Sequence, residues 1–403
     1  MLQTWRWFGP QDTVSIDELL QVGVEGVVSA LHHLKPGTVW SVDEVKKRQQ
    51  SIATRGDGTP SGIAWEVVES LPVSEAIKTQ TGDYREHIQN YKESMRNLAA
   101  CDLKTICYNF MPILDWTRTD LRARMPHGGP AMGFDLLEFA VFDLFILRRS
   151  GAGEEYPEDF VARAQERFDC MDEAARFKLQ QNIVAGLPGA NDNWGIDDIR
   201  QLLATYASTT ADQLRARLID FLSEIMPLAQ ELGMRLCCHP DDPPFTLLGL
   251  PRVMSCEEDY VRVLNAIDVE NNGITLCTGS LGVTRDFDAV GFVERLGSRI
   301  HFAHLRNTTL TEPEIPGRSS FYEAAHLEGG TDMVSVVAAL LRQESKRKAA
   351  GRADWQIPMR PDHGQDLLHD LKVESMPGYP LIGRMRGLAE LRGIMAAVNT
   401  LDK

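Results

Sequence analysis

The chain has 403 residues, of which 43% are hydrophobic and 25% are charged, and its net charge at pH 7 is −15. This hydrophobic share is that of an ordinary globular protein and excludes a disordered or collagen-like chain. The acidic balance argues against nucleic acid as a partner, because binding to phosphates requires a basic surface. The length allows two or three domains, although an α/β barrel of this size forms a single one.

The cysteine content and the N-terminal stretch predict a cytoplasmic chain. The seven cysteines are an odd number, and reduced thiols are typical of the cytoplasm. The stretch MLQTWRWFGPQD lacks the basic and apolar regions of a secretory signal. The most apolar segment, residues 134–149, contains three acidic side chains and is shorter than the about 20 residues that a membrane span needs. We therefore expect no membrane partner and a buried or interface helix at 134–149.

Eight short apolar runs of β-forming residues recur along the chain, with helical patterns between them. The runs cover residues 4–8, 26–31, 63–70, 103–110, 234–239, 274–279, 299–305 and 356–362. Strands that alternate with helices are typical of a parallel sheet, and eight such units predict an α/β fold, a (β/α)₈ TIM barrel. An open doubly wound sheet is the alternative.

The interval between the fourth and fifth runs, residues 111–233, is too long for one crossover connection. It contains the apolar segment 134–149 and a polar helical stretch from Pro157 towards Gly186. We therefore expect a single barrel domain over residues 1–403 with a long, mainly helical insertion after the fourth strand. Such an insertion lies at the carboxyl end of the barrel, where active sites are found. The apolar stripe of 134–149 favours self-association, so we also expect a homo-oligomer, a dimer.

Residue types that bind metals lie at the ends of the last four runs. They are His239, Cys277, His304 and Asp362. Neighbouring strands of a barrel are about 4.7–4.9 Å apart, so side chains from four consecutive strand ends can converge at its mouth. Singly, each residue has a structural explanation, since a buried cysteine is commonly part of a core and an aspartate can cap a helix. Together they predict a shared metal site of catalytic type.

The alternation of side chains along a strand separates these candidates from their neighbours. His301 and His304 are three residues apart and point to opposite faces, and we expect His304 to face the barrel interior. By the same alternation, Cys237 shares the face of His239, whereas Cys238 points toward the helices.

Two further residues are candidates for acid/base chemistry beside the metal. His363 follows Asp362 directly, so on extended backbone its side chain leaves in a different direction. Tyr379 lies on the loop after the eighth run and can fold back over the barrel mouth. The structural alternatives are a histidine that supports a metal ligand and a packed aromatic residue.

Common catalytic motifs are absent, but a set of longer strings is specific. The sequence contains no GxGxxG, GxxxxGK[ST], HExxH, GxSxG or CxxC motif. It does contain WRWFGPQD (5–12), GVVSALHHLKPGTVW (26–40), WEVVESLPV (65–73), YNFMPILDW (108–116), CCHPDDPP (237–244), LCTGSLG (276–282), HFAHLRN (301–307) and MRPDHG (359–364). With these strings the chain resembles the D-mannonate dehydratase family, a metal-dependent barrel family related to xylose isomerase.

The resemblance implies an activity and a cofactor. The activity is that of a carbon–oxygen lyase (hydro-lyase), which converts D-mannonate to 2-keto-3-deoxy-D-gluconate in hexuronate catabolism. The cofactor is one Mn²⁺ or Fe²⁺ ion per subunit, held by His239, Cys277, His304 and Asp362. By ligand softness, a thiolate with two imidazoles favours Zn²⁺ or Fe²⁺ over Mn²⁺, so the identity of the metal stays open.

The resemblance also implies that His363 and Tyr379 form the acid/base pair, without deciding which residue is the acid. Arg306, just past His304, is a candidate for binding the substrate carboxylate, although it can equally pair with an acidic neighbour. A sugar isomerase or epimerase on the same barrel is the alternative enzyme. A sugar-acid binding protein without turnover would leave His363 and Tyr379 without a purpose.

Overall fold

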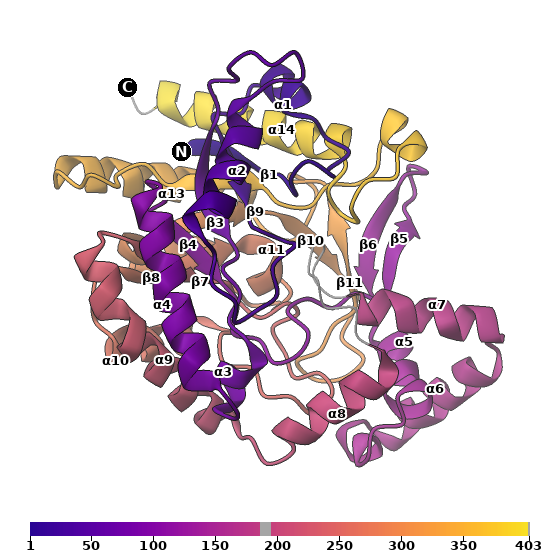
Figure 1. Cartoon of the computed structure of the whole chain (residues 1–403). Coiled ribbons are helices and arrows are strands. Elements are labelled where there is room, and N and C mark those ends of the chain that lie inside the picture. Colours follow the sequence, from indigo (N-terminus) through magenta and orange to yellow (C-terminus); the bar gives the residue numbers. More distant parts are fainter. Residues whose placement is uncertain (186–194, 402–403) are drawn as a thin grey trace.

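The computed structural model describes residues 1–185 and 195–401 of the chain and contains a closed barrel of parallel strands (Figure 1). The order around the barrel is β1-β12-β9-β8-β7-β4-β3-β2. The strands are β1 (Leu2–Arg6), β2 (Gly26–Ser29), β3 (Ala64–Glu69), β4 (Thr105–Tyr108), β7 (Arg235–Cys238), β8 (Asn272–Cys277), β9 (Ile300–Leu305) and β12 (Pro358–Pro361). Each overlaps one predicted run, so the TIM barrel is confirmed and the open sheet is excluded.

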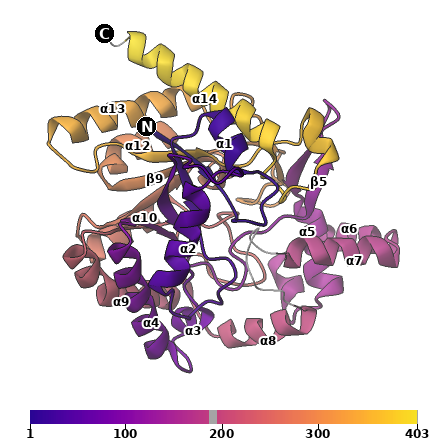
Figure 2. The same cartoon turned by 45° about the horizontal axis from the view of Figure 1, so that its top comes forward.

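Helices surround the barrel strands (Figures 1 and 2). They are α1 (Ile16–Val22), α2 (Val42–Ala53), α3 (Glu75–Thr79), α4 (Tyr84–Ala100), α9 (Ala211–Glu231), α10 (Glu257–Ala266), α11 (Thr278–Leu281), α12 (Ala289–Leu296), α13 (Met333–Ala349) and α14 (Leu381–Leu401). Local sequence sets several of their starts. The Ser15 side chain caps α1 and the Thr210 side chain caps α9, each in a reciprocal capping box with the residue three positions later.

The long interval between β4 and β7 is mainly helical, as predicted, but it begins with a hairpin. Its elements are β5 (Asp120–Arg124), β6 (Pro130–Phe134), α5 (Leu136–Val141), a π-helical turn (Phe142–Ile146), α6 (Glu158–Asp169), α7 (Glu173–Val184) and α8 (Ile196–Tyr206), followed by α9. Helices α5, α6 and α7 form a group at the flank of the barrel in both views (Figures 1 and 2).

A second, four-stranded sheet was not predicted. It has the order β10-β11-β6-β5 and combines the hairpin with β10 (Asn307–Leu310) and β11 (Phe321–Ala324), which follow β9. Phe321 of β11 lies opposite Phe134 of β6, and their rings stack with centroids 5.5 Å apart. Because β10 begins directly after β9 ends, this sheet lies at the carboxyl end of the barrel (Figure 1).

The apolar segment 134–149 packs within the chain. Leu136, Phe139 and Phe142 are fully buried, and the buried carboxylate of Asp143 pairs with Arg149 at 2.7 Å. The segment is therefore a mostly buried helix, in which Leu144, Phe145 and Ile146 are partly buried. The apolar stripe that favoured self-association is largely covered by the chain itself.

The barrel interior below the strand ends is filled by Val28, Val67, Cys107, Cys237 and Phe302. Cys238 belongs instead to the core between barrel and helices, as the alternation predicted. His301 also points away from the barrel interior, because its Nε2 lies 2.8 Å from the carbonyl oxygen of Glu270.

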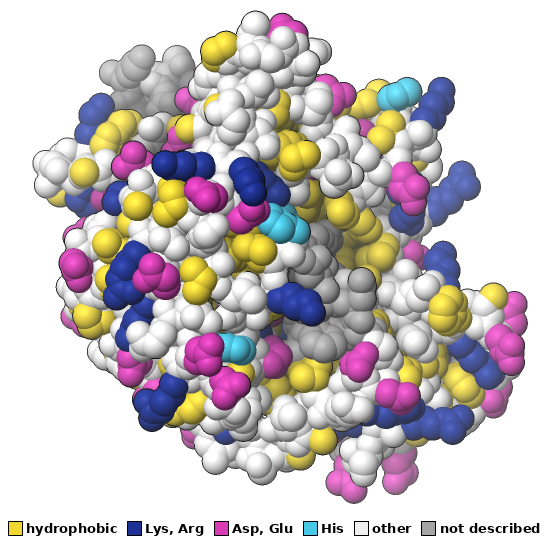
Figure 3. Space-filling view, in the orientation of Figure 1, with side chains coloured by type: hydrophobic (Ala, Val, Ile, Leu, Met, Phe, Trp, Pro, Cys, Tyr) yellow, Lys and Arg dark blue, Asp and Glu magenta, His cyan; other side chains and the backbone are white. Residues whose placement is uncertain are grey.

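On the face shown in Figure 3, Lys and Arg side chains are scattered among acidic ones. Within the part of the chain that the structure describes, no helix combines the length and apolar composition required to cross a membrane.

Candidate active site

The side chains of His239, Cys277, His304 and Asp362 lie together at the carboxyl ends of β7, β8, β9 and β12. His239 Nε2 lies 3.1 Å from His304 Nδ1. Asp362 Oδ2 lies 3.7 Å from Cys277 Sγ and 4.0 Å from His304 Nδ1. One nitrogen or sulfur atom from each of His239, Cys277 and His304 lies within 4.8 Å of the others. The strand ends therefore bring three candidate metal ligands together, and the Asp362 carboxylate lies next to two of them.

The tautomer of His239 follows from its neighbour. Its Nδ1 lies 2.7 Å from the carbonyl oxygen of Pro240, and since a carbonyl only accepts, Nδ1 donates. In the neutral ring, Nε2 then carries the lone pair, and this is the nitrogen that faces His304. Burial lowers the pKa of His239, which favours the neutral form that a metal ligand needs.

Asp362 is held as a carboxylate. Burial opposes its charge, but the neighbouring positive charges, of which that of Arg360 contributes most, outweigh burial and hold the pKa of Asp362 well below its usual range. Arg360 donates Nη1–H to Asp362 Oδ1. Asp362 can therefore offer an ionised oxygen to a metal ion without first losing a proton.

The sulfur of Cys277 is fully buried and accepts from two groups of Ser280. The backbone N–H lies 3.4 Å and the hydroxyl 3.1 Å from Sγ. The thiolate is the form that binds metals, and N–H and O–H donors are neighbours suited to a negative sulfur.

These donors fit a divalent metal ion. Two nitrogen ligands about 2.0–2.1 Å from one ion lie roughly 3.0–3.4 Å apart, and the facing nitrogens of His239 and His304 are 3.1 Å apart. Two imidazoles, a sulfur and a carboxylate form a mixed set that suits first-row transition metals.

His363 and Tyr379 lie beside this cluster and contact each other. Their ring centroids are 5.2 Å apart and the rings are nearly perpendicular, at 87°. The Tyr379 hydroxyl accepts from Arg6 Nη1 at 3.4 Å. Burial lowers the pKa of His363 and raises that of Tyr379, so both residues favour their neutral forms.

A cavity opens at the barrel mouth, beside the candidate metal ligands His239 and Asp362. It is lined by Arg6, Glu69, Asn109, Asp115, Trp116, His239, Asp242, Arg306, Arg360, Asp362, His363 and Tyr379. Most of the lining side chains are polar or charged, and they include both predicted acid/base residues.

Comparison with known proteins identifies the family. The sequence model of the family described as D-mannonate dehydratase (UxuA) matches residues 1–403. The chain belongs to the D-mannonate dehydratase family. This confirms the resemblance indicated by the sequence motifs, and with it the expected hydro-lyase class. The isomerase or epimerase alternative gains no better support.

Relatives cover nearly the whole chain. Mannonate dehydratase from Rhizobium meliloti (strain 1021) is 51% identical over 399 residues, which are 99% of this chain and 97% of the relative. Mannonate dehydratase 1 from Agrobacterium fabrum is 52% identical over 394 residues, covering 98% and 96%. The crystal structure of mannonate dehydratase from Streptococcus suis serotype 2 superposes with a TM-score of 0.76 at 29% identity, covering 100% and 96%.

In this member of the D-mannonate dehydratase family, Arg306 pairs mainly with acidic neighbours. Its Nη1 donates to Asp242 Oδ2 at 2.9 Å, and its Nε lies 3.3 Å from Glu323 Oε2. Arg306 also lines the cavity, and its Nη2 has no hydrogen-bond partner within residues 1–185 and 195–401. Nη2 is therefore the atom through which Arg306 can still contact a substrate carboxylate.

A set of buried charged side chains that the sequence motifs did not indicate surrounds the site. They are Arg6, Glu69, Arg118, Asp242, Glu323 and Arg360. Arg6 and Arg360 both donate to Glu69 at 2.7 Å, and Arg118 donates to Asp242 at 2.8 Å and to Glu323 at 2.9 Å. The network thus alternates arginines with carboxylates.

For some of these residues, the position along a predicted strand could have indicated a place near the site. Arg6 and Glu69 end the first and third strands, and Arg360 precedes Asp362 by two residues, so it shares a strand face with that ligand. Glu323 had no such signal, because it lies on β11 in the second sheet.

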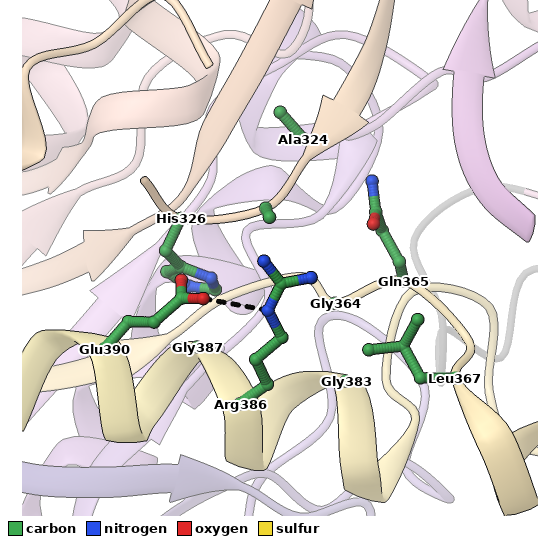
Figure 4. Close-up of a pocket in the computed structure, with 10 residues that line it drawn as sticks. Ala324, His326, Gly364, Gln365, Leu367, Gly383, Arg386, Gly387 and Glu390 are labelled. Carbon is green, nitrogen blue, oxygen red and sulfur yellow. Dashed lines mark hydrogen bonds and ion pairs between the residues drawn. The ribbon is translucent and has the colours of Figure 1, made fainter. Parts of the chain in front are cut away.

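A separate pocket lies between β11, the loop after β12 and α14 (Figure 4). Arg386 Nε there donates to Glu390 Oε1 at 2.8 Å, next to the buried ring of His326. The lining of this pocket contains no member of the predicted ligand set or acid/base pair. The predicted acid/base residues line the cavity at the barrel mouth instead.

Proposed function

We propose that this chain dehydrates D-mannonate to 2-keto-3-deoxy-D-gluconate, with one divalent metal ion per subunit held by His239, Cys277, His304 and Asp362. The observation that carries this proposal is the convergence of His239, Cys277 and His304, with Asp362 in contact, next to the cavity that His363 and Tyr379 line. Membership of the D-mannonate dehydratase family supports the same reaction. The pathway that this reaction serves is hexuronate catabolism.

The reaction removes the hydrogen at C2 and the hydroxyl at C3 as water. The C2–H group of an aldonate is a weak acid, and hydroxide is a poor leaving group. A bound divalent ion supplies Lewis-acid stabilisation of the charge that develops on the substrate carboxylate. One protein group must accept the proton from C2, and another must give a proton to the departing oxygen.

His363 and Tyr379 supply these two proton transfers. They are titratable cavity residues outside the proposed ligand set, and the contact between their rings supports a role for both on the same substrate. A neutral imidazole can accept or donate a proton near neutral pH, and a neutral phenol can donate one without help from a neighbouring cation. Arg306 contributes Nη2 to the substrate carboxylate.

The metal is Mn²⁺ or Fe²⁺, as the resemblance to the family implies. The sulfur of Cys277 and the two imidazoles favour Fe²⁺ among these two ions, because Fe²⁺ is the softer ion. Loading the metal-free protein with each ion, and with Zn²⁺ as a third, compares them directly.

The decisive experiment incubates the metal-loaded protein with D-mannonate and identifies the product by mass spectrometry. We expect a product lighter than the substrate by one water, with the mass and fragmentation of 2-keto-3-deoxy-D-gluconate. A product of unchanged mass would assign an isomerase or epimerase instead. Unchanged substrate with every metal would refute an enzymatic role on this sugar acid.

We also propose that the protein is a cytoplasmic homodimer in which residues 1–403 form a single domain. The apolar segment 134–149 gives little support to the dimer, because it is mostly buried in its own chain. Exposed Leu368, Leu371 and Met376, on the segment between β12 and α14, are apolar side chains that a second copy can cover. Light scattering at micromolar concentration tests this proposal, and a monodisperse monomer would contradict the dimer.

A further inference from the structure

Glu323 lies outside the barrel, on β11 of the second sheet, yet its carboxylate contacts His363. Oε1 of Glu323 lies 3.1 Å from Nδ1 of His363 and accepts from Arg118 Nη2 at 2.9 Å. Its other oxygen lies 3.3 Å from Arg306 Nε. The side chain is 1% exposed, so these contacts replace water almost completely.

The position of the proton on His363 follows from a count of donors. Arg306 Nη1 lies 3.2 Å from the same Nδ1, and a guanidinium only donates, whereas a carboxylate only accepts. Nδ1 therefore either accepts from Arg306 or donates to Glu323. Nη1 has two hydrogens and three acceptors in reach, which are Asp242 Oδ2 at 2.9 Å, His363 Nδ1 at 3.2 Å and Asp362 Oδ2 at 3.4 Å. The two carboxylates are charged and are stronger acceptors than a neutral imidazole, so we assign both hydrogens to them. Nδ1 consequently carries the proton and donates it to Glu323.

Glu323 is held as an ionised carboxylate, the form that accepts the Nδ1–H group of His363. Burial opposes the charge of Glu323, but Arg306, His363 and Arg118 outweigh burial and lower its pKa. The remaining ring nitrogen of His363, Nε2, lies 3.6 Å from Asp362 Oδ1, which is longer than a hydrogen bond. The lone pair of Nε2 is thus free for another partner in the cavity.

We propose that Glu323 is a positioning residue that keeps the proton of His363 on Nδ1 and leaves Nε2 as the base for the substrate. This inference rests on the proposed function, in which His363 moves a proton. Nε2 takes the proton from C2, and the electron pair of that bond forms the C2–C3 double bond. The C3–O bond breaks, and the departing oxygen takes the proton of the Tyr379 hydroxyl and leaves as water.

The cycle closes without a further reactant. The imidazolium that forms on His363 is stabilised by the Glu323 carboxylate through the Nδ1–H donor. Its Nε2 proton returns to the Tyr379 oxygen, whose ring it contacts, and the enol product becomes the 2-keto acid by moving its own proton to C3. The second sheet therefore contributes to catalysis by supplying the partner of the base.

The first test is Glu323→Gln, which keeps the shape of the side chain and removes its charge. A glutamine has only one acceptor oxygen. It therefore cannot accept from Arg306 on one side and from Arg118 and His363 on the other, as the two carboxylate oxygens do. We expect kcat to fall about 10²–10⁴-fold while KM changes less than about threefold and metal content is unchanged. Glu323→Asp, which keeps the charge on a shorter side chain, is expected to recover part of kcat.

The matched control is Glu344→Gln. Glu344 is a buried carboxylate that pairs with the Met1 amino group at 2.9 Å and accepts from the Ile357 N–H at 2.7 Å, away from the cavity. We expect this variant to lose thermal stability without a loss of kcat. A purely structural role for Glu323 would give the same pattern in Glu323→Gln and would overturn the inference.

A second readout needs neither substrate nor metal. The chain has 10 histidines, and ¹⁵N-histidine NMR distinguishes Nδ1–H from Nε2–H rings, with the signal of His363 assigned by its loss in His363→Asn. We expect Nδ1–H in the wild-type protein and a mixture of tautomers in Glu323→Gln. A wild-type Nε2–H ring would overturn the inference even if activity assays fail, whereas absence of D-mannonate dehydration by the wild-type enzyme would overturn the proposed function instead.

Discussion

Oε2 of Glu69 lies 3.4 Å from Nε2 of His304, on the side of the imidazole opposite to Nδ1, which faces His239. Burial opposes the charge of Glu69, but Arg360 and Arg6 outweigh burial and hold its pKa well below the usual range. A carboxylate on the far side of a metal-binding imidazole fixes the orientation of the ring and raises its basicity as a ligand. Glu69 is thus placed to support His304.

Replacing Glu69 with Gln is expected to weaken metal binding about 10–100-fold, the usual loss when such a supporting partner is removed. Competition with a chelator measures the affinity. Glu66→Gln is the matched control, because Glu66 lies on the same strand, three residues away, and so on the opposite face. Equal metal affinity in the two variants would contradict a supporting role for Glu69.

Cys277→Ser and His239→Ala are each expected to abolish metal retention while the chain stays folded. His239→Ala removes one donor of the cluster, and Cys277→Ser replaces the thiolate with a neutral hydroxyl, a much weaker ligand. Both changes leave the barrel strands intact. Elemental analysis of the purified variants gives the metal content, and circular dichroism checks the fold. Cys256→Ser, at an exposed thiol, is the control. Full metal occupancy in both variants would refute the proposed ligand set.

His363→Asn and His304→Ala separate acid/base chemistry from metal binding. We expect His363→Asn to keep the metal and to lose about 10²–10⁴-fold in kcat, with a much smaller change in KM. His304→Ala is expected to lose the metal together with activity. Metal content and turnover are measured on the same preparations. Loss of metal from His363→Asn would make His363 a ligand, and near-full turnover would assign the proton transfer to another group.

Tyr379→Phe removes one hydroxyl and keeps the ring. The Tyr379 ring packs edge-on against Phe8 at 4.9 Å and against His363 at 5.2 Å, so the Phe side chain preserves these contacts. We expect kcat to fall about 10²–10⁴-fold with unchanged metal content and thermal stability. Steady-state kinetics and thermal unfolding test this. A variant with wild-type kcat would show that the hydroxyl takes no part in proton transfer.

The stability of the fold is expected to fall below pH 6.5 through His301. Burial, with Arg235 and Arg347, lowers the pKa of His301 to about 3. The unfolded chain therefore binds this proton before the folded one does, and stability present above pH 6.5 is lost progressively down to about pH 3. Between pH 7.5 and pH 5.0 the loss is about 2 kcal/mol.

His301→Gln provides the comparison, because an amide can still donate to the Glu270 carbonyl that accepts from His301 Nε2. Urea unfolding at the two pH values gives the free energy of unfolding of both proteins. We expect the variant to lose about 2 kcal/mol less than the wild-type protein. Parallel losses in the two proteins would exclude His301 as a source of the acid sensitivity.

The sequence by itself determined the barrel and the residues at its mouth. Apolar runs of β-forming residues marked the eight strands, and the two-residue alternation along a strand separated His304 from His301. These features depend on local periodicity, which a single segment of chain carries in full. The ends of consecutive parallel strands must then meet at one rim, so His239, Cys277 and Asp362 could be placed beside His304 without coordinates.

Only the tertiary structure decided which groups surround that rim. Pairing of β6 with β11 joins residues 130–134 to residues 321–324, and no local pattern encodes such a distant partner. That pairing brings Glu323 to His363. The 134–149 segment, for which composition allowed either a buried or an interface helix, is mostly buried in its own chain. The alternating network of arginines and carboxylates arises in the same way, because a buried charge is tolerated only where the fold supplies its counter-charge from another element.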